Sequence, residues 1–301
     1  MAFGRQLLAI NSMLLVAPIA MIGQTSAATA ATGPATLIIR TDDIGMSHSV
    51  DMAMQKLIAT GLPVSVTVMF ACPWYQEAVE MLRSHPNVSV GVHLVLNSEW
   101  RNYRWGPVTG REAVPTLVDS NGYFFPSAEA LYRNHPDPTQ VEKELRAQIE
   151  RALHTGLKID FMDPHMGTAL DDPTMREIVE RLAGEYGLGV MGYFGEAMES
   201  PQYRAVPAHK VDSLVALVNR LAPGVSVLVT HVGIDDAELG AMVDMNTGEP
   251  LADMSKNRQG ELDALTSSRF SGALKARGIK LMTFRELIAT QGLKAMHRPA
   301  S

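Results

Sequence analysis

The sequence has a single cysteine, no basic block, and no long apolar run beyond its N-terminal segment. Cys72 alone cannot form an internal disulfide, so the stability of the fold must come from packing. Lys and Arg number 26 against 32 Asp and Glu, and no basic stripe occurs, which argues against nucleic acid as a partner. No later segment approaches the roughly 20 apolar residues of a membrane span. What remains is a chain of 301 residues, 46% hydrophobic, which suits one α/β-barrel domain.

The N-terminal segment has the pattern of a secretory signal peptide. Arg5 provides a positive charge, residues 7–22 are mostly apolar, and Thr25-Ser26-Ala27 is a small-residue cleavage site. We therefore expect residues 1–27 to be removed and residues 28–34 to form a disordered leader. The mature protein should then be secreted or periplasmic, without stable insertion in a membrane. An uncleaved N-terminal anchor is the alternative.

Apolar strand-like runs alternate with amphipathic helical patterns after the leader. Strands are expected at residues 36–40, 64–70, 88–96, 158–162, 188–194, 225–230 and 279–283. Helices are expected at residues 50–60, 75–84, 139–155, 173–185, 210–220, 259–276 and 285–290. Because the strands are almost continuously apolar and each precedes a helix, they should be parallel and covered on both faces. The pattern predicts a single α/β domain over residues 35–301, a distorted (β/α) TIM-like barrel of about seven parallel strands. An open doubly wound sheet is the alternative.

Ionisable residues stand at the carboxyl ends of four of the expected strands. Asp42-Asp43 follows the first strand, His93 lies in the third, Asp163-Pro164-His165 ends the fourth and His231 ends the sixth. In parallel α/β folds these ends meet at the face that carries the active site. A lone strand histidine is often a core residue, and an aspartate after a strand is often a turn residue or helix cap. Their coincidence at one face nevertheless favours a joint site.

One carboxylate and two imidazoles that face a single point form a metal site with open positions for water and substrate. Asp43, His93 and His165 are the best set, and we expect one divalent ion, magnesium or zinc. The ion would neutralise one aspartate of the pair and leave Asp42 as a base. It would also polarise a substrate carbonyl and lower the pKa of a water. His231 is placed to protonate a leaving amine.

At these residues the sequence resembles the carbohydrate deacetylases of the YdjC-like family, which includes chitooligosaccharide deacetylases and hopanoid-associated deacetylases. The family pattern is Asp-Asp-(Phe/Ile)-Gly, Gly-x-His-Leu, Asp-x-His and His-x-Gly, which stand here as TDDIG, VGVHL, FMDPH and THVG. The resemblance implies a distorted (β/α) barrel, a divalent metal, and hydrolysis of an N-acetyl group on an amino sugar or oligosaccharide. It makes Asp43, His93 and His165 the metal ligands, Asp42 the base and His231 the acid.

Three positions depart from the family pattern. Gly167 stands where a second histidine is usual, Asp51 stands where an asparagine is common, and Val232 replaces a proline. The three metal ligands are unaffected. The identity of the saccharide, its chain length and the effect of Gly167 on activity stay open, as does the oligomeric state.

Two long irregular segments, residues 97–137 and 238–258, are expected to build the substrate site. The first interleaves Trp100, Tyr103 and Trp105 with arginines, and these rings either stack on sugar faces or seal the barrel mouth as ordinary packing. Tyr193 and Arg258 are further candidates for contact with the substrate. Two other functions remain possible at this stage: a metal-dependent esterase or phosphatase, and an exported protein that binds sugar or metal without turnover.

Overall fold

The structure is a computed structural model that describes residues 33–246 and 253–299. These residues belong to a compact unit spanning Thr32–Ser301. The expected signal peptide, and all of the expected leader except Gly33 and Pro34, lie outside the described residues. No helix in the two described ranges is long and apolar enough to cross a membrane.

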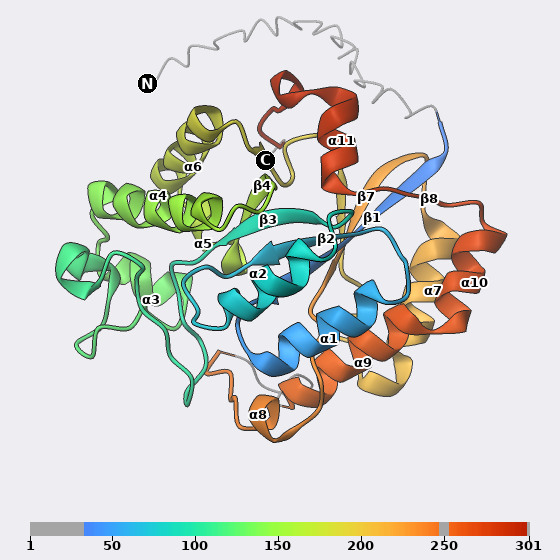
Figure 1. Cartoon of the computed structure of the whole chain (residues 1–301), viewed down its shortest axis with the longest axis horizontal. Coiled ribbons are helices and arrows are strands. Elements are labelled where there is room, and N and C mark those ends of the chain that lie inside the picture. The colour runs from blue at the N-terminus through green and yellow to red at the C-terminus, as the bar shows by residue number, and fades with distance from the viewer. Residues whose placement is uncertain (1–32, 247–252, 300–301) are drawn as a thin grey trace, which may run out of the picture. The chain divides into compact units, whose positions relative to one another are not determined.

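A single parallel sheet forms the centre of this unit (Figure 1). Seven strands follow the spatial order β5-β4-β3-β2-β1-β7-β6, and an eighth, β8, pairs with β1. The strands are β1 Ala35–Ile44, β2 Val64–Val68, β3 Ser89–Leu94, β4 Ile159–Pro164, β5 Gly189–Val190, β6 Ala197–Glu199, β7 Gly224–Thr230 and β8 Lys280–Leu281. The sheet curls into a half-barrel, which confirms the prediction of a distorted TIM-like fold with parallel strands.

Helices connect the strands and cover the sheet, with α4 and α6 beside the β3–β4 end and α7, α9 and α10 beside the β7 end (Figure 1). They are α1 His48–Ile58, α2 Tyr75–Arg83, α3 Ala128–Arg133, α4 Pro138–His154, α5 Thr168–Asp171, α6 Pro173–Tyr186, α7 Lys210–Arg220, α8 Ala237–Gly240, α9 Met254–Thr266, α10 Ser268–Ala276 and α11 Phe284–Gln291. The core that they enclose is built largely from Val, Leu, Ile and Met side chains, as the nearly continuous apolar strands require.

Two expectations for single elements were wrong, and one short strand was missed. The helix expected at residues 259–276 is two helices, because Ser267 has extended backbone (φ −70°, ψ 144°) and caps α10 by accepting from Phe270 N. The strand expected at residues 188–194 pairs over Gly189–Val190 alone, and the chain turns away with Gly192 at φ +86°. The short strand β6 was not expected at all.

Strand β1 has partners along its whole length. It pairs with β7 from Ala35 to Thr41, with β8 at Thr36 and Leu37, and with β2 from Ile39 to Ile44. The register with β2 shifts between Thr41 and Ile44, where a bulge places Asp42 and Asp43 at the carboxyl end of the strand. Strands on both sides of β1 therefore hold the backbone that leads into Asp42 and Asp43.

Candidate metal centre

Asp42 and Asp43 are neighbours in the chain but point to different partners. Asp43 has a left-handed backbone, with φ +64°, which is uncommon for a residue other than glycine although aspartate tolerates it. Asp42 Oδ2 lies 2.6 Å from Arg40 Nη2, whereas Asp43 Oδ2 lies 2.6 Å from Arg258 Nη2. The turn at the strand end thus separates two carboxylates that would otherwise repel each other.

Asp43, His93 and His165 meet at one buried point. Asp43 Oδ1 lies 3.3 Å from His93 Nε2 and 3.3 Å from His165 Nδ1, and the two nitrogens are 3.2 Å apart. Each residue is at most 4% exposed. The sequence therefore predicted correctly that these three side chains lie together, although they come from β1, β3 and the turn after β4.

Each imidazole is oriented by a carboxylate on its far side. His93 Nδ1 lies 2.7 Å from Asp163 Oδ1, and His165 Nε2 lies 3.0 Å from Glu99 Oε2. A ring nitrogen that donates to a carboxylate leaves its other nitrogen as the acceptor, so both free lone pairs point at Asp43 Oδ1. Carboxylates in this position are typical partners of metal-ligating histidines.

The chemistry of this donor set fits a dication. Asp43 Oδ1 is buried, and with both imidazoles neutral the two facing ring nitrogens and this oxygen are three acceptor atoms that converge on one point. Burial would raise the pKa of Asp43, but Arg258 and the two imidazoles hold it well below its usual value. Burial lowers the pKa of His165, but Glu99 and Asp43 outweigh it and raise that pKa to about 10, so this ring holds a proton that a bound dication would displace. The site therefore attracts positive charge.

A second cluster of possible ligands, Asp42, His93 and Asp163, overlaps the first. Arg40 already occupies it, because its guanidinium forms ion pairs with both Asp42 and Asp163. Arg40 is 2% exposed, and a guanidinium between two buried carboxylates neutralises them as a metal would. The charges of Asp42 and Asp163 are therefore already compensated by Arg40.

His231 lies beside Asp42, whose Oδ2 is also 4.0 Å from His93 Nε2. Its Nε2 is 3.6 Å from Asp42 Oδ2, its Nδ1 is buried without a hydrogen-bond partner, and its ring lies 5.1 Å from that of Tyr203. Its backbone N–H donates to Glu261, which is itself paired with the buried Lys210. The base and acid predicted from the sequence are therefore adjacent and held by buried networks.

These five residues open into a pocket of about 390 Å³. Among the residues expected to contact substrate, Trp100 and Arg258 line it, and the Arg258 guanidinium lies 5.4 Å from the Trp100 ring. The remaining walls include Met166, Tyr203 and Asp244. Gly167, the position of the missing second histidine, also lines the pocket; its φ is +79°, and a Cβ there would lie 3.1 Å from the carboxylate oxygens of Asp171.

The positions of Tyr103, Trp105 and Tyr193 do not support the substrate contacts expected for them. Tyr103 donates from its hydroxyl to Met46 O, and Trp105 is 4% exposed and donates to Asn97 O. Tyr193 is 5% exposed and its hydroxyl donates to Glu180 on α6. None of the three lines the pocket, and for the first two the packing alternative accounts for the geometry.

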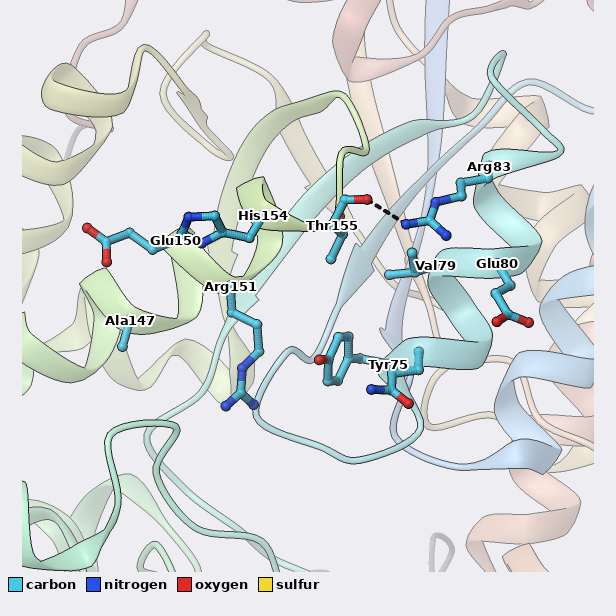
Figure 2. A pocket seen from close by; sticks show the side chains of 10 residues that line it. Tyr75, Val79, Glu80, Arg83, Ala147, Glu150, Arg151, His154 and Thr155 are labelled. Carbon is cyan, nitrogen blue, oxygen red and sulfur yellow. Dashed lines mark hydrogen bonds between the residues drawn. The ribbon is translucent and has the colours of Figure 1, made fainter.

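A larger hollow, about 720 Å³ in volume, lies between α2 and α4 (Figure 2). Its polar groups are mostly engaged: Arg83 donates to Thr155 O, and the Arg151 guanidinium lies 5.6 Å from the Tyr75 ring. Asp43, His93 and His165, the group within the described residues that is not already paired with Arg40, line the smaller pocket instead. Chemistry rather than size therefore identifies the site.

Sequence reasoning missed Arg40, Glu99 and the role of Asp163. Arg40 carried a signal, because it is the one charge in the apolar run LIIR before the aspartates. Glu99 lies in an irregular loop and gave no such signal. Its position follows from backbone bonds between Met245 N and Glu99 O and between Arg101 N and Val243 O, which join two distant loops.

Comparisons with known proteins agree with this geometry. The profile of a family described as YdjC-like protein matches residues 36–276. A carbohydrate deacetylase of Brevibacillus brevis is 30% identical over 83% of this chain and 99% of its own length. One of Thermus thermophilus is 33% identical over 72% of this chain and 84% of its own length. A crystal structure from Enterococcus faecalis V583, described as a candidate cellobiose-phosphate cleavage protein, is 24% identical with a TM-score of 0.71, covers 85% of this chain and 99% of its own, and shares the fold.

Proposed function

The chain belongs to the YdjC-like family, and from that premise we propose that it is a metal-dependent carbohydrate deacetylase. Its reaction would be hydrolysis of an N-acetyl group on an amino sugar or oligosaccharide. The observation that carries the proposal is the buried triangle of Asp43, His93 and His165 with Asp42 and His231 beside it. Binding alone would need neither a second aspartate nor a histidine at that place.

The chemistry of the donor set supports zinc as the dication. Two imidazoles and one carboxylate would hold it. Imidazoles suit zinc better than magnesium, which prefers oxygen ligands.

Asp42 and His231 have separate roles in amide hydrolysis. When bound, the dication would lower the pKa of a water and polarise the acetyl carbonyl. Asp42 is oriented by Arg40 and by Thr67 Oγ1 at 3.3 Å, and it takes a proton from the attacking water. His231 gives a proton to the amine nitrogen as the carbon–nitrogen bond breaks. The products are acetate and a free amino sugar, so the atoms of amide and water are all accounted for.

The pocket supports entry of one N-acetylated sugar unit. Its volume of about 390 Å³ is near the small end of the range for ligand sites. Tyr203 provides aromatic surface in its wall, and an apolar sugar face packs well against such surface, whereas Trp100 is 1% exposed and its ring faces Arg258. We propose that the rest of a longer saccharide extends outside the pocket.

The experiment is acetate release from a panel of N-acetylated saccharides, before and after a chelator and again after zinc is restored. Release that disappears with the chelator and returns with zinc supports the proposal. Release from O-acetyl esters only would make the protein an esterase. Stoichiometric zinc binding without acetate from any substrate would favour a binding protein, and either result would overturn the proposal.

A further inference from the structure

The turn that presents Asp43 is held by few bonds. Met46 N donates to Asp43 O at 3.0 Å and closes the turn, and Met69 N donates to Ile44 O at 2.8 Å. The remaining backbone donor, Gly45 N, has a side chain as its acceptor: Oδ1 of Asp51 at 2.7 Å. Asp51 therefore reaches back from α1 to fix the middle of the turn.

The turn is also packed tightly on the side away from Asp51. Gly45 has φ +82°, and a Cβ at this position would lie 2.7 Å from the Cα of Tyr75 at the start of α2. The turn is thus pressed against α2 on one side and tied to α1 on the other. A change in the Asp51 bond would act on Asp43, two residues before Gly45, and through it on the metal ligands.

The other oxygen of Asp51 is in an unfavourable place for a negative charge. Asp51 is 2% exposed, and its Oδ2 is buried with no hydrogen-bond partner. No ion pair to Asp51 exists among residues 33–246 and 253–299. The charged groups that face it are Glu77 from α2 and Glu238 from α8, both acidic. An ionised Asp51 would place a third carboxylate beside Glu77 and Glu238, and it has no cation of its own.

The other titratable groups around Asp51 do not supply a positive charge to it. Cys72 and Tyr103 pack near it from the loops after β2 and β3. His48, on the exposed side of α1, lies 2.9 Å from Glu77, and Asp236 accepts from Ser49 Oγ. Burial, the largest cause, raises the pKa of Asp51 to about 8; Glu77 and Glu238 raise it too, while the Gly45 bond lowers it.

We propose that Asp51 is a positioning residue that works as a neutral carboxylic acid, accepting from Gly45 N at Oδ1 and directing the proton on Oδ2 toward the carboxylate of Glu77. In this form the protonated Oδ2 is itself a donor. This explains why no donor faces this buried oxygen. A neutral aspartic acid has an acceptor oxygen and a donor, as the side chain of asparagine has. Asp51 acts through Gly45, so it touches no substrate.

The proposal predicts how stability depends on pH. An unfolded chain loses this proton near pH 3.8, whereas the folded protein keeps it until about pH 8. Between these values the folded state binds one proton more, so rising pH destabilises it, and the loss levels off above the folded pKa. Asp51→Asn keeps both hydrogen bonds and cannot ionise. The stability advantage of the variant over wild type should therefore grow from about pH 5 to about pH 8 and then stay constant.

The test is thermal unfolding of the metal-free full chain over this pH range for wild type, Asp51→Asn and a matched control. Asp263→Asn changes an exposed aspartate on α9. Its unfolding temperature should differ from that of wild type by the same amount at every pH. The proposal would be overturned if the difference in unfolding temperature between Asp51→Asn and wild type did not change with pH. It would also be overturned if Asp51→Asn became less stable than wild type as the pH rises.

Zinc affinity, measured by calorimetry at about pH 7, provides a second readout. Asp51→Asn should bind zinc within about twofold of wild type, whereas Asp51→Ala leaves Gly45 N without an acceptor and should bind about tenfold more weakly. An equal loss of zinc affinity in Asp51→Asn and Asp51→Ala would contradict the proposal. This arm rests on the proposed metal site, but the unfolding arm does not. If no variant binds zinc and the pH effect persists, the metal assignment fails while the role of Asp51 stands.

Discussion

Glu99 holds His165 on the side of the ring opposite to Asp43 and His93. Its Oε2 lies 3.0 Å from His165 Nε2, while Nδ1 of the same ring faces Asp43 and His93. Glu99 is 3% exposed and comes from the irregular loop after β3. An inserted loop, rather than the strands of the barrel, thus completes the support of a ligand.

Removing this carboxylate should weaken metal binding. Partners of ligating histidines typically contribute 10-fold to 100-fold in affinity, so we expect Glu99→Ala to bind zinc roughly 10–100 times more weakly. Glu99→Gln keeps a hydrogen-bond acceptor for His165, so its zinc affinity should fall less than that of Glu99→Ala. Glu112→Ala, at an exposed ion pair with Arg111, is the control. Calorimetric titration decides, and wild-type affinity in Glu99→Ala would show that the contact has no such role.

The two aspartates should fail in different ways when each is changed to asparagine. Asp42→Asn cannot accept a proton, so zinc should stay bound while the rate of acetate release falls by roughly 10²–10⁴-fold. Asp43→Asn removes a ligand, so zinc binding should weaken, with activity partly recovered at high zinc. His231→Ala should resemble Asp42→Asn. If Asp42→Asn lost zinc and Asp43→Asn kept it, the roles would be reversed.

Arg40 should be important for stability as well as for the site. Arg40→Met would leave Asp42 and Asp163 buried without their counter-charge, and breaking such a pair costs about 3–5 kcal/mol. The free energy of unfolding in urea, measured without metal, checks this. Adding Asp163→Asn to Arg40→Met should recover part of the loss, since one uncompensated charge is then gone. A stability change below about 1 kcal/mol in Arg40→Met would contradict the ion-pair argument.

We also propose that the protein is exported and that its mature chain begins near Ala28, since residues 1–27 have the pattern of a signal peptide. Mass spectrometry of the protein from its native host is the measurement. A mature mass that starts near Ala28 in a secreted or periplasmic fraction is the expected result. An intact Met1 in a cytoplasmic fraction would show that the segment is not a cleaved signal.

The sequence was sufficient for the parts of the site that depend on strand ends. Asp43, His93 and His165 follow apolar strands, and parallel strands bring their carboxyl ends to one face whatever the details of the loops. The break at Ser267 was harder, because the apolar pattern continues through it and only one dihedral differs. Glu99 was out of reach, since its partner lies 66 residues away and depends on how two loops pack.

The aromatic residues illustrate the same limit. Trp100 and Trp105 are five positions apart in one irregular segment, yet only Trp100 lines the pocket. Loops have no fixed period that would indicate which side chains point inward, whereas strands and helices do. Sequence alone could identify the segment but not which of the two rings lines the pocket.

The backbone bonds between residues 99–101 and 243–245 link two segments that a (β/α) fold would normally let vary separately. One segment carries the support of His165, and the other carries Asp244 in the pocket wall. An insertion or deletion in either segment would break the register of the pairing and disturb the metal site. Descendants of this chain can therefore acquire a new substrate range most readily by changing side chains, or by altering both loops together.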